Sequence, residues 1–225
     1  MASFKTHITF GIALGILSPI VLSILALGSG TDFFLALLVL AILGSILPDI
    51  DSDSGIPFHL TFGTLSLLSA VFVFFFLFYE DGNTFVKSVL WAILALLGVW
   101  GLLGGLFKKC TKHRGMAHSI PIAVLFTLIT FFLMSRYSFG DVEALLLGCI
   151  LGLGYCIHLV LDEVYSLVDF HGKKLSPKQS LGSSLKFFSH SKWINMVVYG
   201  GIVILLYPNW ELFREMIERI LADIR

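Results

Sequence analysis

The sequence has little charge. Asp, Glu, Lys and Arg make up 13% of its 225 residues, whereas roughly 25% is usual for a soluble domain. Hydrophobic residues account for 57% of the chain, and its mean hydropathy is +0.93. The 15 basic residues balance the 15 acidic ones, so no net field favours nucleic acid as a partner. This composition excludes an ordinary soluble domain and indicates a protein that lies mostly in lipid.

Cysteine is also scarce, which limits the chemistry that the chain can carry. Cys110, Cys149 and Cys156 form no CxxC pair, and an odd number at these spacings gives no disulfide framework. The sequence also lacks the GxSxG motif that presents a serine nucleophile in many hydrolases. Catalysis would therefore have to come from other residue types.

Long apolar runs dominate the sequence. About 20 apolar residues cross a bilayer core as a helix, and seven segments reach or approach that length: 8–27, 33–48, 60–79, 85–107, 118–134, 143–161 and 193–208. The second, fifth and seventh would be only about 24 Å long, so each could instead be re-entrant. The glycines of GVWGLLGG are interpreted as close-packing positions between helices. The pattern predicts an all-α, polytopic transmembrane helix bundle with about seven membrane segments.

The basic residues are distributed unevenly over the two sides of such a bundle. With seven crossings, ten of the 15 Lys and Arg residues fall on the side of the amino terminus and five on the other. Because cytoplasmic loops are enriched in Lys and Arg, we expect the amino terminus inside the cell and the carboxyl terminus outside.

Three regions follow from this arrangement. Residues 1–165 would form a membrane-embedded helical domain, 166–192 a basic cytoplasmic loop, and 193–225 the last membrane segment with an amphipathic carboxyl-terminal helix. The final stretch, WELFREMIERILADIR, has the pattern of a helix that lies at the far membrane interface.

Ionisable groups gather on the predicted cytoplasmic side. All seven histidines lie there or within about a turn of it, together with Asp49, Asp51, Asp53 and Asp162. Such groups are costly near membrane depth and usually have partners or a function. Four motifs contain most of them, whereas three histidines lie outside these motifs and are interpreted as interfacial or loop residues: His59, His171 and His190.

Two of the motifs contain acidic residues. His158 and Asp162 stand four residues apart in GYCIHLVLDE, which places both side chains on one helix face, where they can reach one metal ion. In LPDIDSDSG, three alternating carboxylates repel one another unless a cation, a shared proton or water relieves them. A calcium loop is excluded because its sixth position is Ser54 and its twelfth is Leu60. A simple helical pair and a solvated capping turn are the alternatives.

The other two motifs contain histidines that precede apolar segments. In KKCTKHRGMAHS, His113 and His118 flank Arg114 and Gly115. Gly115 lets the backbone fold tightly enough for the two imidazoles to converge, and Arg114 suits a pair of phosphate or carboxylate oxygens. In THITFG, His7 precedes the first crossing; alone it would be a hydrated interfacial residue. Together the four motifs predict a mono- or dinuclear site for zinc or a similar divalent ion at the ends of four helices.

These motifs resemble those of the YdjM-like family of bacterial inner-membrane proteins, which are described as membrane-bound metal-dependent hydrolases. The resemblance rests on His7, on PDIDS with Asp49 and Asp51, on HRGMAHS and on the HLVLD pair, and it spans about residues 1–165. It implies a metal-dependent hydrolase in the bacterial inner membrane. A looser similarity to zinc-dependent phospholipase C rests on the pair His158 and Asp162.

The resulting hypothesis is a hydrolase at the cytoplasmic membrane face that uses water activated by one or two divalent ions, most simply zinc. Asp51 is the predicted general base or a further ligand, and Arg114 would steady the anionic oxygen of a phosphoester. The location favours membrane lipids as surroundings and a lipid-linked or phospholipid substrate. The predicted metal ligands are His7, Asp49, His113, His118, His158 and Asp162.

Two other classes of function stay open. In the first, a metal ion only ties helix ends together, or the cytoplasmic face binds a partner without catalysis. In the second, the protein transports a divalent ion. Transport is disfavoured because the outer halves of the apolar segments are nearly all Leu, Ile, Val, Phe and Gly, whereas an ion path needs polar groups through the membrane.

Overall fold

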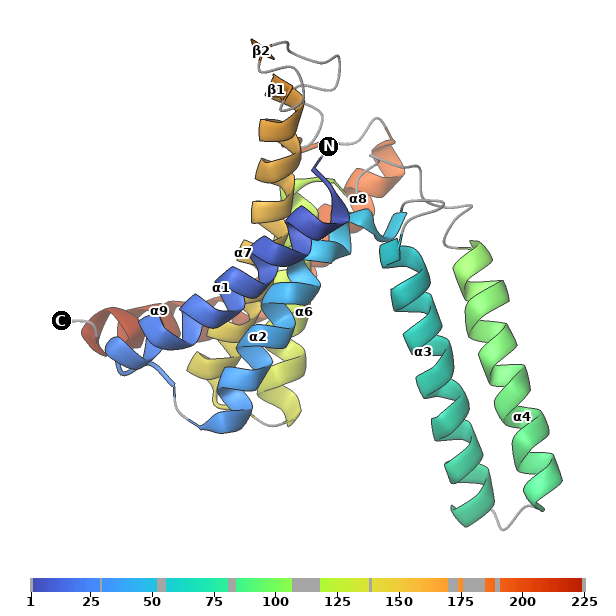
Figure 1. Ribbon diagram of the computed structural model, residues 1–225. Helices are drawn as coiled ribbons and strands as arrows, with labels where there is room; N and C mark the ends of the chain where they lie inside the picture. The colour runs from blue at the N-terminus through green and yellow to red at the C-terminus, as the bar shows by residue number, and fades with distance from the viewer. Residues whose placement is uncertain are drawn as a thin grey trace. The chain divides into compact units, whose positions relative to one another are not determined.

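The computed structural model describes residues 2–28, 30–51, 56–80, 84–106, 118–137, 139–169, 174–175, 185–188 and 191–223 (Figure 1). The chain divides into two compact units. The core unit comprises Met1–Pro48 and Met116–Arg225, and the hairpin unit comprises Asp49–Gly115.

Where the structure describes it, the core unit consists of helices and one short strand pair, in which Val168 lies opposite Leu175 in antiparallel register. The 3-10 helix η1 (Leu47–Asp51) continues from its second α-helix into the hairpin unit. The elements of the core unit are α1 (Phe4–Ile24), α2 (Thr31–Ile46), α6 (Ile120–Tyr137), α7 (Asp141–Leu167), β1 (Val168–Asp169), β2 (Lys174–Leu175), α8 (Lys192–Leu206), the 3-10 helix η4 (Tyr207–Asn209) and α9 (Trp210–Asp223).

The ends of α1 and α2 follow from local chemistry. The Ser3 hydroxyl caps α1 by accepting a hydrogen bond from the Thr6 N–H at 3.2 Å, which satisfies one of the donors left over at a helix start. At the end of α2, Pro48 has no backbone N–H, so the helical ladder loses a bond and the chain tightens into η1. The acidic motif that follows Pro48 therefore begins in a turn.

The helix α7 is the centre of the core unit. It packs against α1, α2 and α6, which lie beside it in Figure 1. Leu37 and Ala41 of α2 and Leu147 and Leu151 of α7 belong to one buried apolar cluster. This packing brings the amino-terminal ends of α1 and α6 close to the carboxyl-terminal parts of α2 and α7, as contacts of His7, Ser45 and His118 with α7 show.

Two glycines allow α2 and α7 to approach closely. A Cβ atom on Gly154 would lie 2.6 Å from the Ala41 carbonyl oxygen, and one on Gly44 would collide with the Leu151 carbonyl oxygen. Small residues permit such backbone approach between helices in lipid. The approach brings Ser45, the second-last residue of α2, against α7 at His158.

The hairpin unit contains α3 (Ile56–Phe75), the π-helix η2 (Phe76–Glu80), α4 (Phe85–Leu97) and the π-helix η3 (Gly98–Leu103). A Cβ atom on Gly104 would lie 3.3 Å from the Phe58 ring, which makes this glycine a close-packing position. The other three glycines of GVWGLLGG have open space where a Cβ would lie among the residues described. Among the residues described, the interpretation of these glycines as close-packing positions is therefore supported for Gly104 and not for the other three.

Most helices are long and apolar enough to span a membrane. Five helices in the described part of the chain meet that criterion, and a sixth span is possible if the bent pair α8 and α9 forms one. The apolar stretch of α6, Ile120–Arg136, is shorter, as predicted for this segment. Each of the seven predicted segments coincides with a helix. The all-α, polytopic transmembrane fold is confirmed, whereas the proposed division at residues 165 and 192 stays a prediction.

The helix α9 turns away from α8 by 69°. Phe213 and Met216 are buried against α6 and α7, in a cluster with Phe131. On the exposed face, the Arg214 guanidinium lies 2.9 Å from the Glu211 carboxylate. The predicted amphipathic helix therefore forms, with its apolar face packed on the core unit.

Candidate metal centre

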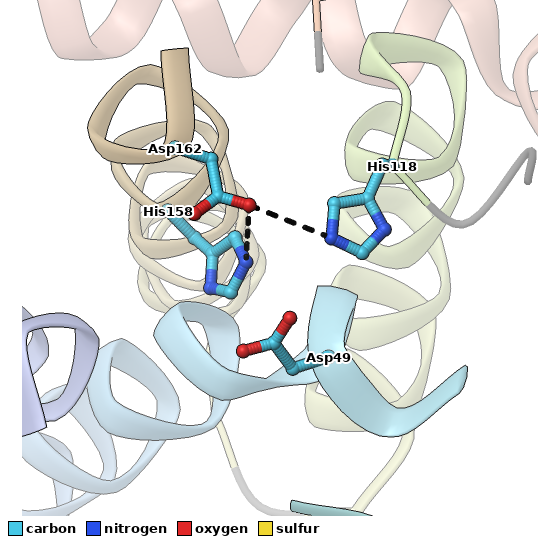
Figure 2. A group of neighbouring side chains, drawn as sticks. All are labelled: Asp49, His118, His158 and Asp162. Atoms are coloured by element: carbon cyan, nitrogen blue, oxygen red, sulfur yellow. Dashed lines mark ion pairs between the residues drawn. The ribbon is translucent and has the colours of Figure 1, made fainter. Parts of the chain in front are cut away.

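His158 and Asp162 lie on one face of α7, near its carboxyl end. Both side chains are buried, with 0% and 1% of their residues' surface exposed. His158 Nε2 lies 3.9 Å from Asp162 Oδ2, and Figure 2 shows both groups directed toward the same space. The four-residue spacing thus gives the shared face that the sequence predicted.

Ser45 fixes the orientation of the His158 ring. Its carbonyl oxygen lies 2.7 Å from His158 Nδ1. Because a carbonyl oxygen only accepts hydrogen bonds, Nδ1 carries the proton in the neutral ring, and Nε2 then keeps its lone pair. This is the arrangement that metal-binding histidines usually have, with one ring nitrogen held by an acceptor and the other left for the ion.

His118 approaches the same carboxylate from another element. It stands two residues before the start of α6 and is fully buried. Its Nε2 atom lies 3.8 Å from Asp162 Oδ2, and its ring centroid lies 5.6 Å from that of His158. Asp162 Oδ2 is buried and has no hydrogen-bond partner among the residues described, so a cation at this position would satisfy it.

Asp49 completes a group of four possible ligands. One ligand atom from each of Asp49, His118, His158 and Asp162 lies within 4.8 Å of the others, and Figure 2 shows the four side chains converging. Asp49 is the third residue of η1, which follows α2, and it is half-buried. Two carboxylates so close together in a poorly hydrated site repel each other unless a cation lies between them. Two imidazoles and two carboxylates form a donor set that fits zinc or a similar ion.

His7 lies beside this group. Its ring stacks on that of His158, with centroids 3.6 Å apart and planes at 14°. His7 Nε2 lies 3.3 Å from Asp162 Oδ1, and the Ala2 backbone N–H donates to the same oxygen at 2.9 Å. The start of α1 therefore holds one carboxylate oxygen of Asp162, and the other oxygen faces the two remaining histidines.

A family model described as YdjM inner membrane protein matches residues 1–217. The chain belongs to the YdjM family. The match continues past residue 165 through α8 into α9, so the family likeness extends beyond the part that carries the motifs. Membership agrees with the apolar helices in placing the protein in a membrane. No curated protein and no solved structure matches the chain.

In this member of the YdjM family, four of the six predicted ligands come together in the group of possible ligands. His7 contacts that group. The sixth, His113, and the predicted anion-binding residue Arg114 lie outside the described residues. Asp51 ends η1, and its side chain is outside the described part of the structure.

The remaining histidines have other surroundings. The exposed His59 ring lies on α3, with its centroid 5.5 Å from that of Trp100, as suits an interfacial residue. His171 and His190 lie outside the described residues. The sequence did not predict two backbone groups that contact the site, namely the Ser45 carbonyl at His158 and the Ala2 N–H at Asp162. Backbone groups are the same in every residue type, so a sequence motif does not reveal them.

Proposed function

We propose that the protein is a membrane-bound metal-dependent hydrolase that cleaves a phosphoester with metal-activated water. The single observation that supports it most is the convergence of His158 and Asp162 of α7 with Asp49 of η1 and His118, which precedes α6, onto a space smaller than 5 Å across. Such a buried set of charged and basic groups is costly in a membrane protein. Its retention is best explained by the binding of a divalent ion.

Each residue has a defined part in this proposal. His158, locked by the Ser45 carbonyl, presents Nε2, and Asp162 presents Oδ2. His118 and Asp49 supply the other two donors. A zinc or similar ion held there provides Lewis acidity and activates water near neutral pH. Asp51, two residues beyond Asp49, is proposed to take a proton from that water.

The substrate and the orientation are parts of the same proposal. Arg114, four residues before His118, is proposed to steady an anionic phosphoester oxygen. The excess of Lys and Arg on the side that carries the site favours a cytoplasmic position. A site at the membrane surface suits a phosphoester that is attached to a lipid.

Metal analysis combined with hydrolysis assays tests this function. The purified wild-type protein is expected to carry a stoichiometric divalent ion and to hydrolyse at least one compound of a phosphomonoester, phosphodiester and pyrophosphate panel. His158→Ala should lose both the ion and turnover, and Asp51→Asn should keep the ion but lose turnover. His59→Ala is the matched control, because this histidine lies outside the group. Absence of a stoichiometric ion in the wild type would refute the proposal.

A structural metal site is the second candidate. It is favoured by the complete burial of His118 and His158, because structural sites are closed whereas catalytic sites keep one position open. In that case an ion would tie α6, α7 and the end of α2 together without chemistry. Stoichiometric metal with no turnover on any member of the panel would select this candidate.

A further inference from the structure

The helix α9 has a second apolar face that the core unit leaves uncovered. The residues of its packed face stand at positions i, i+3 and i+7, and those of the uncovered face at i, i+7 and i+11. At 3.6 residues per turn, the two faces lie about a quarter of a turn apart. The packed face consists of Phe213, Met216 and Ile220. The uncovered face, here called the outer stripe, consists of Trp210, Ile217 and Leu221, which are 61%, 51% and 54% exposed.

Charged residues occupy most of the remaining surface of α9. The segment Trp210–Asp223 contains four acidic residues and two basic ones, so its net charge is −2. The Arg214 guanidinium lies 2.9 Å from the Glu211 carboxylate and 3.8 Å from that of Glu218. This cation is therefore engaged within the helix, and the polar side of α9 has acidic character.

The helix α9 lies at the end of the core unit that is opposite the candidate metal centre. Phe213 and Met216 share a buried cluster with Ala144, the fourth residue of α7. About 21 Å of helix separates Ala144 from His158, at 1.5 Å per residue. Because α7 is a candidate membrane span, α9 and the metal centre lie toward opposite membrane surfaces.

The exposed apolar surface of α8 leads into the outer stripe. Val203 and Ile204, near the end of α8, are 60% and 72% exposed, and Tyr207 is 83% exposed. Trp210 follows three residues after Tyr207, at the bend between the two helices. Apolar helix surfaces face lipid in a membrane, and Tyr and Trp mark its boundary with water. The outer stripe therefore continues a surface that already faces lipid.

We propose that the outer stripe inserts among the acyl chains of zwitterionic phospholipids, at the membrane surface opposite the candidate metal centre. The core unit holds α9 from one side, the outer stripe faces the acyl chains, and the charged residues face water. Helices that bind anionic lipid have an excess of Lys and Arg on their polar side, whereas α9 has an excess of Glu and Asp. This lipid-binding surface goes beyond the proposed hydrolase and does not depend on it.

Fluorescence quenching of Trp210 in the reconstituted full-length protein tests the insertion. A triple variant, Trp91→Phe, Trp100→Phe and Trp193→Phe, leaves Trp210 as the only tryptophan. In phosphatidylcholine vesicles, lipids with brominated acyl chains should quench Trp210, and aqueous acrylamide should quench it less than it quenches N-acetyltryptophanamide. Full acrylamide quenching without any bromine effect would place α9 in water and overturn the proposal. Protection from both quenchers would show that a second copy of the chain covers the outer stripe, which would overturn it as well.

Two neighbouring residues provide a matched pair of variants. In the same background, Leu221→Asp brings a carboxylate into the outer stripe, where lipid disfavours charge, and should roughly halve the quenching by brominated lipid. Ala222→Asp brings the same group to an exposed position outside the outer stripe and should leave the quenching unchanged. If the triple variant does not fold, the pair is compared with all four tryptophans present. Leu221→Asp should then have the lower thermal unfolding midpoint in the vesicles, and equal midpoints would refute the insertion.

The headgroup preference is tested with two brominated lipids at the same mole fraction. Brominated phosphatidylcholine should quench Trp210 about twofold more than brominated phosphatidylglycerol, because the acidic side of α9 repels an anionic headgroup. Glu215→Lys changes an exposed residue of α9, brings the net charge of the helix to zero and should remove the difference. Equal quenching by the two lipids in the presence of Glu215, or an unchanged difference in Glu215→Lys, would overturn the headgroup assignment.

Discussion

His7 Nε2 lies 3.3 Å from Asp162 Oδ1, the same oxygen that accepts the Ala2 N–H at 2.9 Å. Asp162 Oδ2 instead faces His118 and His158, at 3.8 and 3.9 Å. The two carboxylate oxygens thus have different surroundings, one set by the start of α1 and one by the other possible ligands. In this geometry His7 orients the carboxylate and supports the His158 ring that it stacks on.

We expect His7→Ala to weaken zinc binding by about 10- to 100-fold, which is the usual effect of losing a residue that orients a ligand. One equivalent of zinc should still bind at saturating concentration. His118→Ala, in contrast, should lose stoichiometric zinc. Competition with a chelating dye measures the affinities, and His59→Ala serves as the control with a histidine removed elsewhere. Loss of stoichiometric zinc in His7→Ala would instead make His7 a ligand, as the sequence predicts.

Metal removal should destabilise the protein, because the Asp49 and Asp162 carboxylates would then repel each other. A ligand present at 1,000 times its dissociation constant stabilises the folded state by about 4 kcal/mol. EDTA should therefore lower the thermal unfolding midpoint of the wild type in detergent, and added zinc should restore it.

Asp162→Asn provides the internal control for that experiment. This substitution removes one of the two carboxylates, and with it one possible metal ligand. The thermal unfolding midpoint of Asp162→Asn should therefore not respond to EDTA or zinc. A wild-type midpoint that is equally insensitive would show that no ion contributes to its stability.

The approach of α2 to α7 should be sensitive to a single methyl group. A Cβ on Gly154 would lie 2.6 Å from the Ala41 carbonyl oxygen, and such overpacking typically costs about 1–3 kcal/mol. Gly154→Ala should therefore lower the thermal unfolding midpoint and, by moving Ser45 from His158, weaken zinc binding. Gly200→Ala is the matched control, since nothing lies within 4 Å of its Cβ position. Equal midpoints for the two variants would contradict the close packing.

Local patterns explain what the sequence could predict. The helices follow from runs of apolar residues, and the pairing of His158 with Asp162 follows from one helical turn; both are properties of a few neighbouring residues. The convergence of Asp49 and His118 on that pair also follows, because antiparallel helices bring alternate ends together. The sequence therefore predicted the membrane fold and all four residues of the possible ligand group.

Contacts between distant segments explain what it could not predict. The Ser45 carbonyl and the Lys186 bridge to Ser119 use backbone atoms, which any residue could supply. The cluster of glycines in GVWGLLGG looks like a close-packing motif, yet the close approach between α2 and α7 is made by the isolated Gly44 and Gly154. Which glycine meets a neighbouring helix is decided by tertiary packing, and composition alone does not contain that information.

The position of the carboxyl terminus depends on α8. The hairpin unit contains two candidate membrane spans, which add an even number of crossings if both span the membrane. If α8 crosses the membrane, the total is odd and the two termini lie on opposite sides; if it is re-entrant, they lie on the same side. The 69° turn into α9 suits a helix that reaches the far surface and then lies along it.

We therefore expect alkaline phosphatase fused after Arg225 to be active, because it folds only outside the cytoplasm, and a green fluorescent protein at that position to be dark. Fusions after Lys174, in the predicted cytoplasmic loop, should give the opposite pair of signals and report on the side that carries the metal centre. Cytoplasmic signals at both positions would make α8 re-entrant. External signals after Lys174 would instead place the metal centre outside, because α7 ends on the side where its His158 and Asp162 lie.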